Sequence, residues 1–100
     1  MIKHIVMWKL HSRAEGFSKL ENAARIKDEL LKLPSLIEQI NSFEVGTNIN
    51  SSELAFDLVL CSEFRSSIDL VNYQNHPAHI KFKEFINGLR SEIHVVDYEI

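Results

Sequence analysis

One hundred residues with a mass of 11.6 kDa are enough for one small domain with a modest hydrophobic core. The hydrophobic share of 45% and the charged share of 25% are typical of globular proteins and exclude a disordered chain. A formal net charge of −3 argues against nucleic acid or an anionic membrane surface as the main partner. We therefore expect a single domain over residues 1–100.

The cysteine count and the N-terminal residues bear on the cellular compartment. Cys61 is the single cysteine, which excludes an intrachain disulfide and a cysteine-rich zinc site. Lys3, His4 and Lys9 interrupt the apolar N-terminal run, so the sequence predicts no signal peptide. No stretch of about 18 apolar residues predicts a membrane span. These features favour a reducing compartment, and we expect a cytoplasmic protein.

The first half of the chain predicts a strand, a helix and a second strand. Residues 2–11 alternate in side-chain direction and carry large apolar groups on both faces, as in a strand covered on both sides. The Ser-x-x-Glu motif at 12–15 has the form of a capping box, and it predicts a helix over 13–33. Pro34 would end that helix. Residues 43–49 alternate again and predict a half-buried strand.

The second half repeats this order in a different sequence. Residues 56–64 predict a third strand, and the Ser-x-x-Asp motif at 66–69 predicts the start of a second helical region. Pro77 suits the first turn of a further helical segment. Residues 92–100 predict the closing strand. The order βαββαβ with short right-handed connections gives an α+β, ferredoxin-like fold, an antiparallel sheet with its helices on one face.

Such a fold leaves one face of the sheet without helices. By side-chain parity, we expect that face to carry Val6, Trp8, Leu10, Leu58 and Leu60. An exposed apolar surface of this kind indicates an interaction site, covered by a second subunit or by a ligand. The sequence therefore predicts a two-fold homodimer in which Trp8 or its strand neighbours are buried.

The most distinctive local motif is His76-Pro77-Ala78-His79. Two imidazoles three residues apart at a helix start suit metal binding or acid–base chemistry near neutral pH. Neither an H-E-x-x-H motif nor a carboxylate cluster supplies the missing metal ligands. We therefore expect no bound metal at His76 and His79. In the structural alternative, one of the two histidines caps the helix and the other is partly exposed.

Three further residues bear on a site. His4 shares a strand face with apolar neighbours, so its ring needs a hydrogen-bond partner at the strand end or a polar pocket. Tyr73 precedes His79 by six residues, and both can line one side of the same helical region. No activating neighbour accompanies Cys61, which we expect to be an inert thiol. The absence of a phosphate-binding loop and of a nucleophile elbow predicts no cofactor.

Several segments together resemble one known family. They are residues 1–10, Glu44-Val45-Gly46, and the stretches 57–60, 73–79 and 96–99. In order and spacing they are similar to the Dabb family, the stress-responsive dimeric α/β-barrel domains. The resemblance implies a ferredoxin-like subunit whose sheet packs on its two-fold mate to close a barrel. It also implies a cavity between the sheet and the helices.

The resemblance carries expectations about function. Most members have no assigned reaction, but some plant members resemble polyketide cyclases. In those, a strand-one His, a helix Tyr and the second His of the His-Pro-x-His stretch line the cavity, and they correspond here to His4, Tyr73 and His79. The cyclases carry a further His in the third strand, where this chain has Leu58. Metal at the dimer contact is associated with the family, but no motif assigns it to residues here.

Three hypotheses follow for the function. The leading one is a homodimeric barrel, stress-related in role, whose cavity binds a small apolar or aromatic carbonyl ligand or catalyses a reaction on it. A second is a cyclase- or lyase-type enzyme with His79 as the base. The third is a structural or stress-protective dimer without a ligand. An enzyme requires a cavity that His4, Tyr73 and His79 share, whereas a structural protein would fill that space with Trp8, Leu58 and their neighbours.

Overall fold

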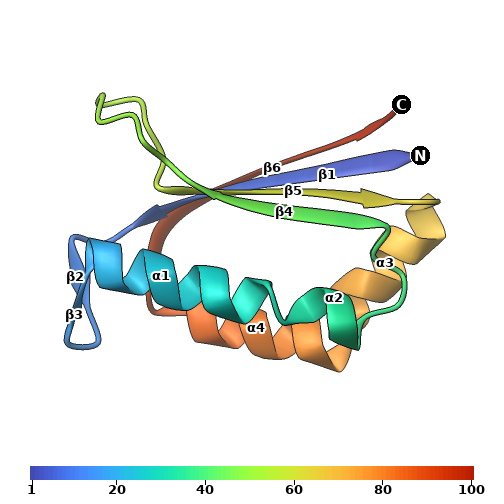
Figure 1. The fold of residues 1–100 in the computed structure, drawn as a ribbon, viewed down its shortest axis with the longest axis horizontal. Helices are drawn as coiled ribbons and strands as arrows, with labels where there is room; N and C mark the ends of the chain where they lie inside the picture. Colours follow the sequence, from blue (N-terminus) through green and yellow to red (C-terminus); the bar gives the residue numbers. More distant parts are fainter.

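The computed structural model describes residues 1–100 as one antiparallel four-stranded sheet with helices on one of its faces (Figure 1). The strand order in the sheet is β4-β5-β1-β6. The strands of this sheet are β1 (Ile2–Leu10), β4 (Ser42–Thr47), β5 (Leu58–Phe64) and β6 (Arg90–Glu99). The helices are α1 (Lys19–Leu30), α2 (Leu33–Leu36), α3 (Ser67–Asn75) and α4 (Pro77–Asn87). A small hairpin of β2 (Arg13–Ala14) and β3 (Phe17–Ser18) precedes α1.

This arrangement confirms the predicted ferredoxin-like fold. β1 lies in the middle of the sheet and pairs antiparallel with β5 on one side and with β6 on the other. The two termini lie side by side, and the backbone N–H of Ile100 donates to the carbonyl of Met1 at 2.9 Å (Figure 1). None of the helices is long and apolar enough to cross a membrane.

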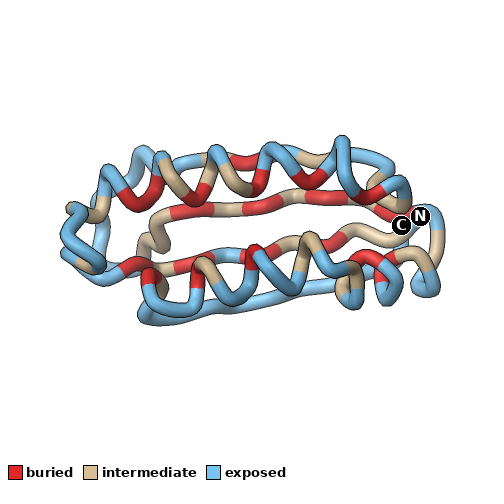
Figure 2. Tube along the Cα trace, turned by 90° about the horizontal axis from the view of Figure 1, so that it is seen from below, coloured by how far each residue is buried: buried red, intermediate tan, exposed pale blue.

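The core lies between the sheet and the helices. It contains the residues that we expected on the opposite, helix-free face of the sheet. Val6, Trp8 and Leu10 are each at most 5% exposed, and Figure 2 shows buried positions along both the helices and the strands. The ring of Trp8 packs edge-on against Phe82 of α4, with 6.0 Å between the ring centroids. Leu58 and Leu60 of β5 pair with Trp8 and Val6 and are buried on the same face. The expectation that Val6, Trp8, Leu10, Leu58 and Leu60 lie on the helix-free face is therefore wrong. Side-chain parity groups residues by face, but it does not say which face the helices cover.

The helix-free side of the sheet, which we name the outer face, carries a different set of residues. Its centre is formed by apolar side chains of three adjacent strands: Ile5, Met7, Val59, Cys61, Val96 and Tyr98. Charged pairs lie at its two ends. The ammonium of Lys3 is 3.5 Å from a carboxylate oxygen of Glu63, and that of Lys9 is 3.8 Å from one of Glu92. A single chain leaves this apolar centre without a protein cover.

The start of the first helix also differs from the prediction. Glu15 and Gly16 have φ values of 52° and 83°, so they form a hairpin turn between β2 and β3 where a helix from residue 13 was expected. The capping box is instead the next Ser-x-x-Glu motif, at Ser18 and Glu21. The Ser18 hydroxyl accepts from the Glu21 N–H at 3.2 Å, and the Glu21 carboxylate accepts from the Ser18 N–H at 2.9 Å. The first Ser-x-x-Glu motif is followed by Gly16, whose left-handed backbone suits a turn.

The elements that carry the site agree closely with their sequence signals. Ser66 caps α3, and its hydroxyl accepts from the Asp69 N–H at 3.2 Å. Pro77 occupies the first turn of α4, as expected. His76 caps the same helix, because its Nδ1 accepts from the Ala78 N–H at 3.0 Å. The His76 ring is thus the capping histidine of the structural alternative.

Candidate functional site

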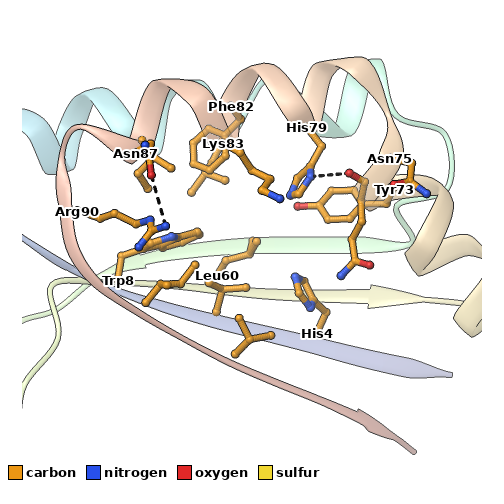
Figure 3. A pocket seen from close by; sticks show the side chains of 16 residues that line it. His4, Trp8, Leu60, Tyr73, Asn75, His79, Phe82, Lys83, Asn87 and Arg90 are labelled. Carbon is orange, nitrogen blue, oxygen red and sulfur yellow. Dashed lines mark hydrogen bonds between the residues drawn. The ribbon is translucent and has the colours of Figure 1, made fainter.

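A pocket of about 500 Å³ lies between the sheet and the C-terminal helices (Figure 3). Strands β1, β5 and β6 form its floor, and helices α1, α3 and α4 supply the rest of its wall. Its lining residues are His4, Val6, Trp8, Leu30, Leu60, Tyr73, Gln74, Asn75, His79, Phe82, Lys83, Ile86, Asn87, Arg90, Ile93 and Val95. The wall is thus mostly apolar with a few converging polar groups, which is how small-molecule sites are usually built.

His79 projects into this pocket from the first turn of α4 (Figure 3). Its Nδ1 lies 3.1 Å from the backbone carbonyl of Gln74. A carbonyl only accepts, so Nδ1 carries the proton and Nε2 keeps its lone pair. Burial lowers the pKa of His79, and the charges of Lys83 and His4 lower it further against the opposing effect of the Gln74 carbonyl. His79 is therefore neutral at pH 7 and able to accept a proton.

Tyr73 lies beside His79, with 4.5 Å between the two ring centroids. The side chain is 1% exposed and comes from the last turns of α3. Burial raises the pKa of its phenol, so the hydroxyl stays protonated across the physiological range. Figure 3 draws no hydrogen bond from this hydroxyl to another lining residue. Tyr73 thus offers a hydrogen-bond donor next to the free Nε2 of His79.

His4 faces the same space from the sheet side (Figure 3). It is 4% exposed, and its ring meets Tyr73 edge-on with 6.0 Å between centroids. Its Nδ1 pairs with a carboxylate oxygen of Asp97, which lies directly opposite on β6. Asp97 is thus the hydrogen-bond partner that a histidine on an apolar strand face needs. It also fixes the ring, so that Nε2 is the nitrogen left free.

The structure therefore brings together the three residues singled out from the sequence, with the Tyr73 ring between the two imidazoles. The space they share is open and is not filled by core side chains. Leu58 is buried in the core and does not line the pocket, whereas Leu60 of the same strand does. A cavity that all three residues line is the feature that we expected of an enzyme, in contrast to a structural protein.

Other predicted residues lie outside this arrangement. His76 faces the end of α4 as its cap, so the two histidines of the His-Pro-x-His stretch have different partners. Groups of three or more His, Cys, Asp or Glu residues with the geometry of a metal site are absent. Cys61 is a half-buried free thiol on the outer face. Neither residue belongs to the pocket.

Sequence reasoning missed several functional groups of the pocket. Asp97 pairs with His4 across 93 residues, and the carbonyl of Gln74 orients His79. Lys83 and Arg90 add two cations to the wall. The position of Lys83 could have been inferred, because it follows His79 by four residues and so lies on the same helix face. The pairing of His4 with Asp97 depends on strand register, for which no local motif exists.

Comparison with known proteins identifies relatives that share this fold. The family model described as "Stress Responsive A/B Barrel Domain" (Dabb) matches residues 2–100. A stress-response A/B barrel domain-containing protein of Arabidopsis thaliana, DABB1, is 26% identical over 98 residues. The match covers 98% of this chain and 46% of that protein, so the chain spans about half the length of this relative.

Two solved structures share the architecture. A dimeric ferredoxin-like protein of unknown function from Bacteroides fragilis is 32% identical, with a TM-score of 0.87, and the match covers 99% of this chain and 95% of the other. A hydroxynitrile lyase from Passiflora edulis is 22% identical, with a TM-score of 0.81, and the match covers 99% and 92%. At that identity the second likeness concerns the fold alone.

Proposed function

This chain belongs to the Dabb family of stress-responsive A/B barrel domains, and we propose that its pocket binds a small, largely apolar carbonyl compound with His79 as general base. The observation that carries the proposal is the hydrogen bond from His79 Nδ1 to the Gln74 carbonyl. It leaves Nε2 of a neutral imidazole as the free proton acceptor in a mostly apolar pocket. An unperturbed imidazole already titrates close to physiological pH, at about 6.5.

The side chains beside His79 suit abstraction of a proton next to a carbonyl group. Removal of a proton next to a carbonyl group transfers that proton to Nε2 of His79 and places negative charge on the carbonyl oxygen. The protonated hydroxyl of Tyr73 donates a hydrogen bond to that oxygen and stabilises the enolate. His4, held by Asp97, supplies a second polar contact from the sheet. Return of the proton from His79 to the ligand restores the neutral imidazole.

Proton abstraction can be measured without knowledge of the physiological substrate. We expect the protein to accelerate exchange of the methyl protons of acetophenone in deuterated water, followed by proton NMR. His79→Ala should lower that rate by about 100-fold or more, because general bases contribute 10²–10⁴-fold. Tyr73→Phe should slow exchange through loss of the donor at the oxygen. His11→Ala removes an exposed histidine outside the pocket and serves as the matched control. Equal exchange by wild type and His79→Ala would reject the base.

A lyase reaction is a second candidate, favoured by the position of Lys83. Its charge acts on His79 from one turn further along α4, where it can hold an anionic leaving group. In such a reaction His79 takes the hydroxyl proton of a hydroxynitrile, the carbon–carbon bond to the nitrile breaks to leave a carbonyl compound, and the departing cyanide takes the proton from His79 to leave as hydrogen cyanide. Release of cyanide from mandelonitrile, lost in His79→Ala, would favour this function over simple proton exchange. The solved hydroxynitrile lyase has the same fold.

We also propose that two copies of this chain pair through the outer face. The apolar centre is formed by Ile5, Met7 and their neighbours, and the ion pairs Lys3–Glu63 and Lys9–Glu92 lie at its ends. An apolar centre with a polar rim is typical of a protein–protein interface. The Bacteroides fragilis relative is a dimer. A self-complementary sheet face suits a two-fold contact.

A further inference from the structure

The distribution of charge in the pocket wall points to the kind of ligand that it holds. Among the sixteen lining residues are two permanent cations, Lys83 and Arg90, and no aspartate or glutamate. Neither cation forms a salt bridge with a carboxylate elsewhere in the chain, although five other ion pairs are present. The guanidinium of Arg90 donates one long hydrogen bond, of 3.5 Å, to the side-chain oxygen of Asn87. A concave, partly apolar site with uncompensated positive charge attracts an anion.

The cations occupy a defined part of the pocket. His79, Lys83 and Asn87 follow one another at intervals of four residues, so they form one row along α4 (Figure 3). With a rise of 1.5 Å per residue, the row from His79 to Asn87 is about 12 Å long. Arg90 begins β6 just beyond the end of α4, and in Figure 3 it lies beside Asn87 at the opposite end from Tyr73. The pocket therefore has a base at one end and a guanidinium at the other.

Apolar side chains connect these two ends. Phe82 and Ile86 of α4 and Val6 and Leu60 of the sheet line the pocket. A ligand that uses both ends thus needs an apolar body between its two polar groups. Arginine presents several N–H donors in a planar fork that matches a carboxylate, which makes it better suited to this anion than a lysine. Lys83 lies between the two ends and adds positive charge along the path.

We propose that the pocket binds an elongated apolar carboxylate, whose carboxylate group is held by Arg90 and whose carbonyl group lies at His79 and Tyr73. The ligand is thus an apolar oxo acid. This inference rests on the proposed function for the carbonyl end and adds the anionic end. Lys83 strengthens the attraction for the carboxylate and favours negative charge that develops next to His79.

The single tryptophan of the chain allows a direct test. Trp8 lines the pocket, so its fluorescence reports on ligands that enter. The probes are octanoate and octan-1-ol, which share an apolar chain and differ in charge, with dissociation constants confirmed by calorimetry. We expect octanoate to bind about tenfold more tightly than octan-1-ol, because hydrogen bonds to charged groups are the stronger ones. Arg90→Gln should remove that preference and leave the affinity for octan-1-ol unchanged.

Two further variants complete the design. Lys83→Gln should weaken octanoate binding several-fold. Because Lys83 is exposed, we expect this variant to fold, so it tests the anionic end even if Arg90→Gln does not fold. Lys81→Gln removes the same charge from the same helix at a position outside this pocket, so it should bind octanoate as wild type does. Circular dichroism establishes which variants are folded.

The outcomes separate this inference from the proposed function. Equal affinity for octanoate and octan-1-ol, or an unchanged octanoate affinity in folded Arg90→Gln and Lys83→Gln, would overturn the anionic end. If acetophenone exchange still depended on His79 in that case, the proposed function, with His79 as general base in this pocket, would remain valid. If octanoate binding required Arg90 but proton exchange were the same in wild type and His79→Ala, the anion site would be supported and His79 would be rejected as the base. Failure of both probes to bind would overturn the inference.

Discussion

The two faces of one sheet differ in what covers them, although the same strands build both. On the helix side, Val6 and Trp8 of β1 are almost fully buried and His4 reaches a pocket. On the outer face, Ile5 and Met7 alternate with them and stay partly exposed in the single chain. Alternate residues of β1 therefore serve two different purposes. The inner set forms the core and the pocket, and the outer set forms the face through which we propose that two copies pair.

The largest effect is expected on the inner face. Trp8→Asp removes a buried ring from the Phe82 contact and places a carboxylate in the core. Loss of a buried aromatic side chain costs about 3–5 kcal/mol, and burial of an unpaired charge adds to this cost. We expect the variant to lack a cooperative unfolding transition, as measured by circular dichroism in urea. A folded Trp8→Asp dimer would contradict the placement of Trp8 in the core.

The neighbouring residue gives the matched case on the outer face. Met7→Asp introduces the same charge one residue away, at a side chain that is 37% exposed. We expect a folded chain that no longer pairs, because the charge would be buried only in the contact between two copies. Light scattering at micromolar concentration should show a dimer for wild type and a monomer for the variant. A wild-type protein that is monomeric there, with its fold intact, would reject the outer-face dimer.

The thiol of Cys61 can report whether a second copy covers the outer face. It lies opposite Ile5 on the outer face and is half-buried in the single chain. If the second copy covers it, a thiol reagent reaches it only when the dimer opens. We expect the Met7→Asp monomer to be labelled about tenfold faster than wild type. Equal labelling rates, measured at a protein concentration where wild type is dimeric, would place Cys61 outside the contact.

The smallest effect concerns the acid stability of the inner face. Burial lowers the pKa of His79, so the unfolded chain takes up a proton at a higher pH than the folded chain does. The free energy of unfolding should therefore fall as the pH drops below about 6.5, the ordinary pKa of histidine. His79→Gln should show a shallower decrease, measured by urea denaturation at about pH 7.5 and about pH 5.5. His11→Ala, which removes an exposed histidine, should follow wild type; an equally steep decrease in His79→Gln would contradict this assignment.

The local signals in the sequence were sufficient for most of the fold. Ser66 and Pro77 indicate where α3 and α4 begin, and the alternation of residues 2–11 predicts β1. The first helix shows where such signals become ambiguous. Two Ser-x-x-Glu motifs lie six residues apart. The first ends at Glu15, which with Gly16 has a positive φ angle and forms a hairpin turn. It is followed by Gly16, whose left-handed backbone suits a turn, whereas the second motif forms the capping box of α1.

For this protein the sequence by itself determined that His4, Val6 and Trp8 share one face, and that Tyr73 and His79 belong to one helical region. Tertiary structure decided which face the helices cover, because the two-residue period of a strand is the same from either side. It also decided the partners of the two pocket histidines, Asp97 and the carbonyl of Gln74. Strand register brings His4 and Asp97 together across 93 residues, and no local pattern of residues encodes a contact at that distance.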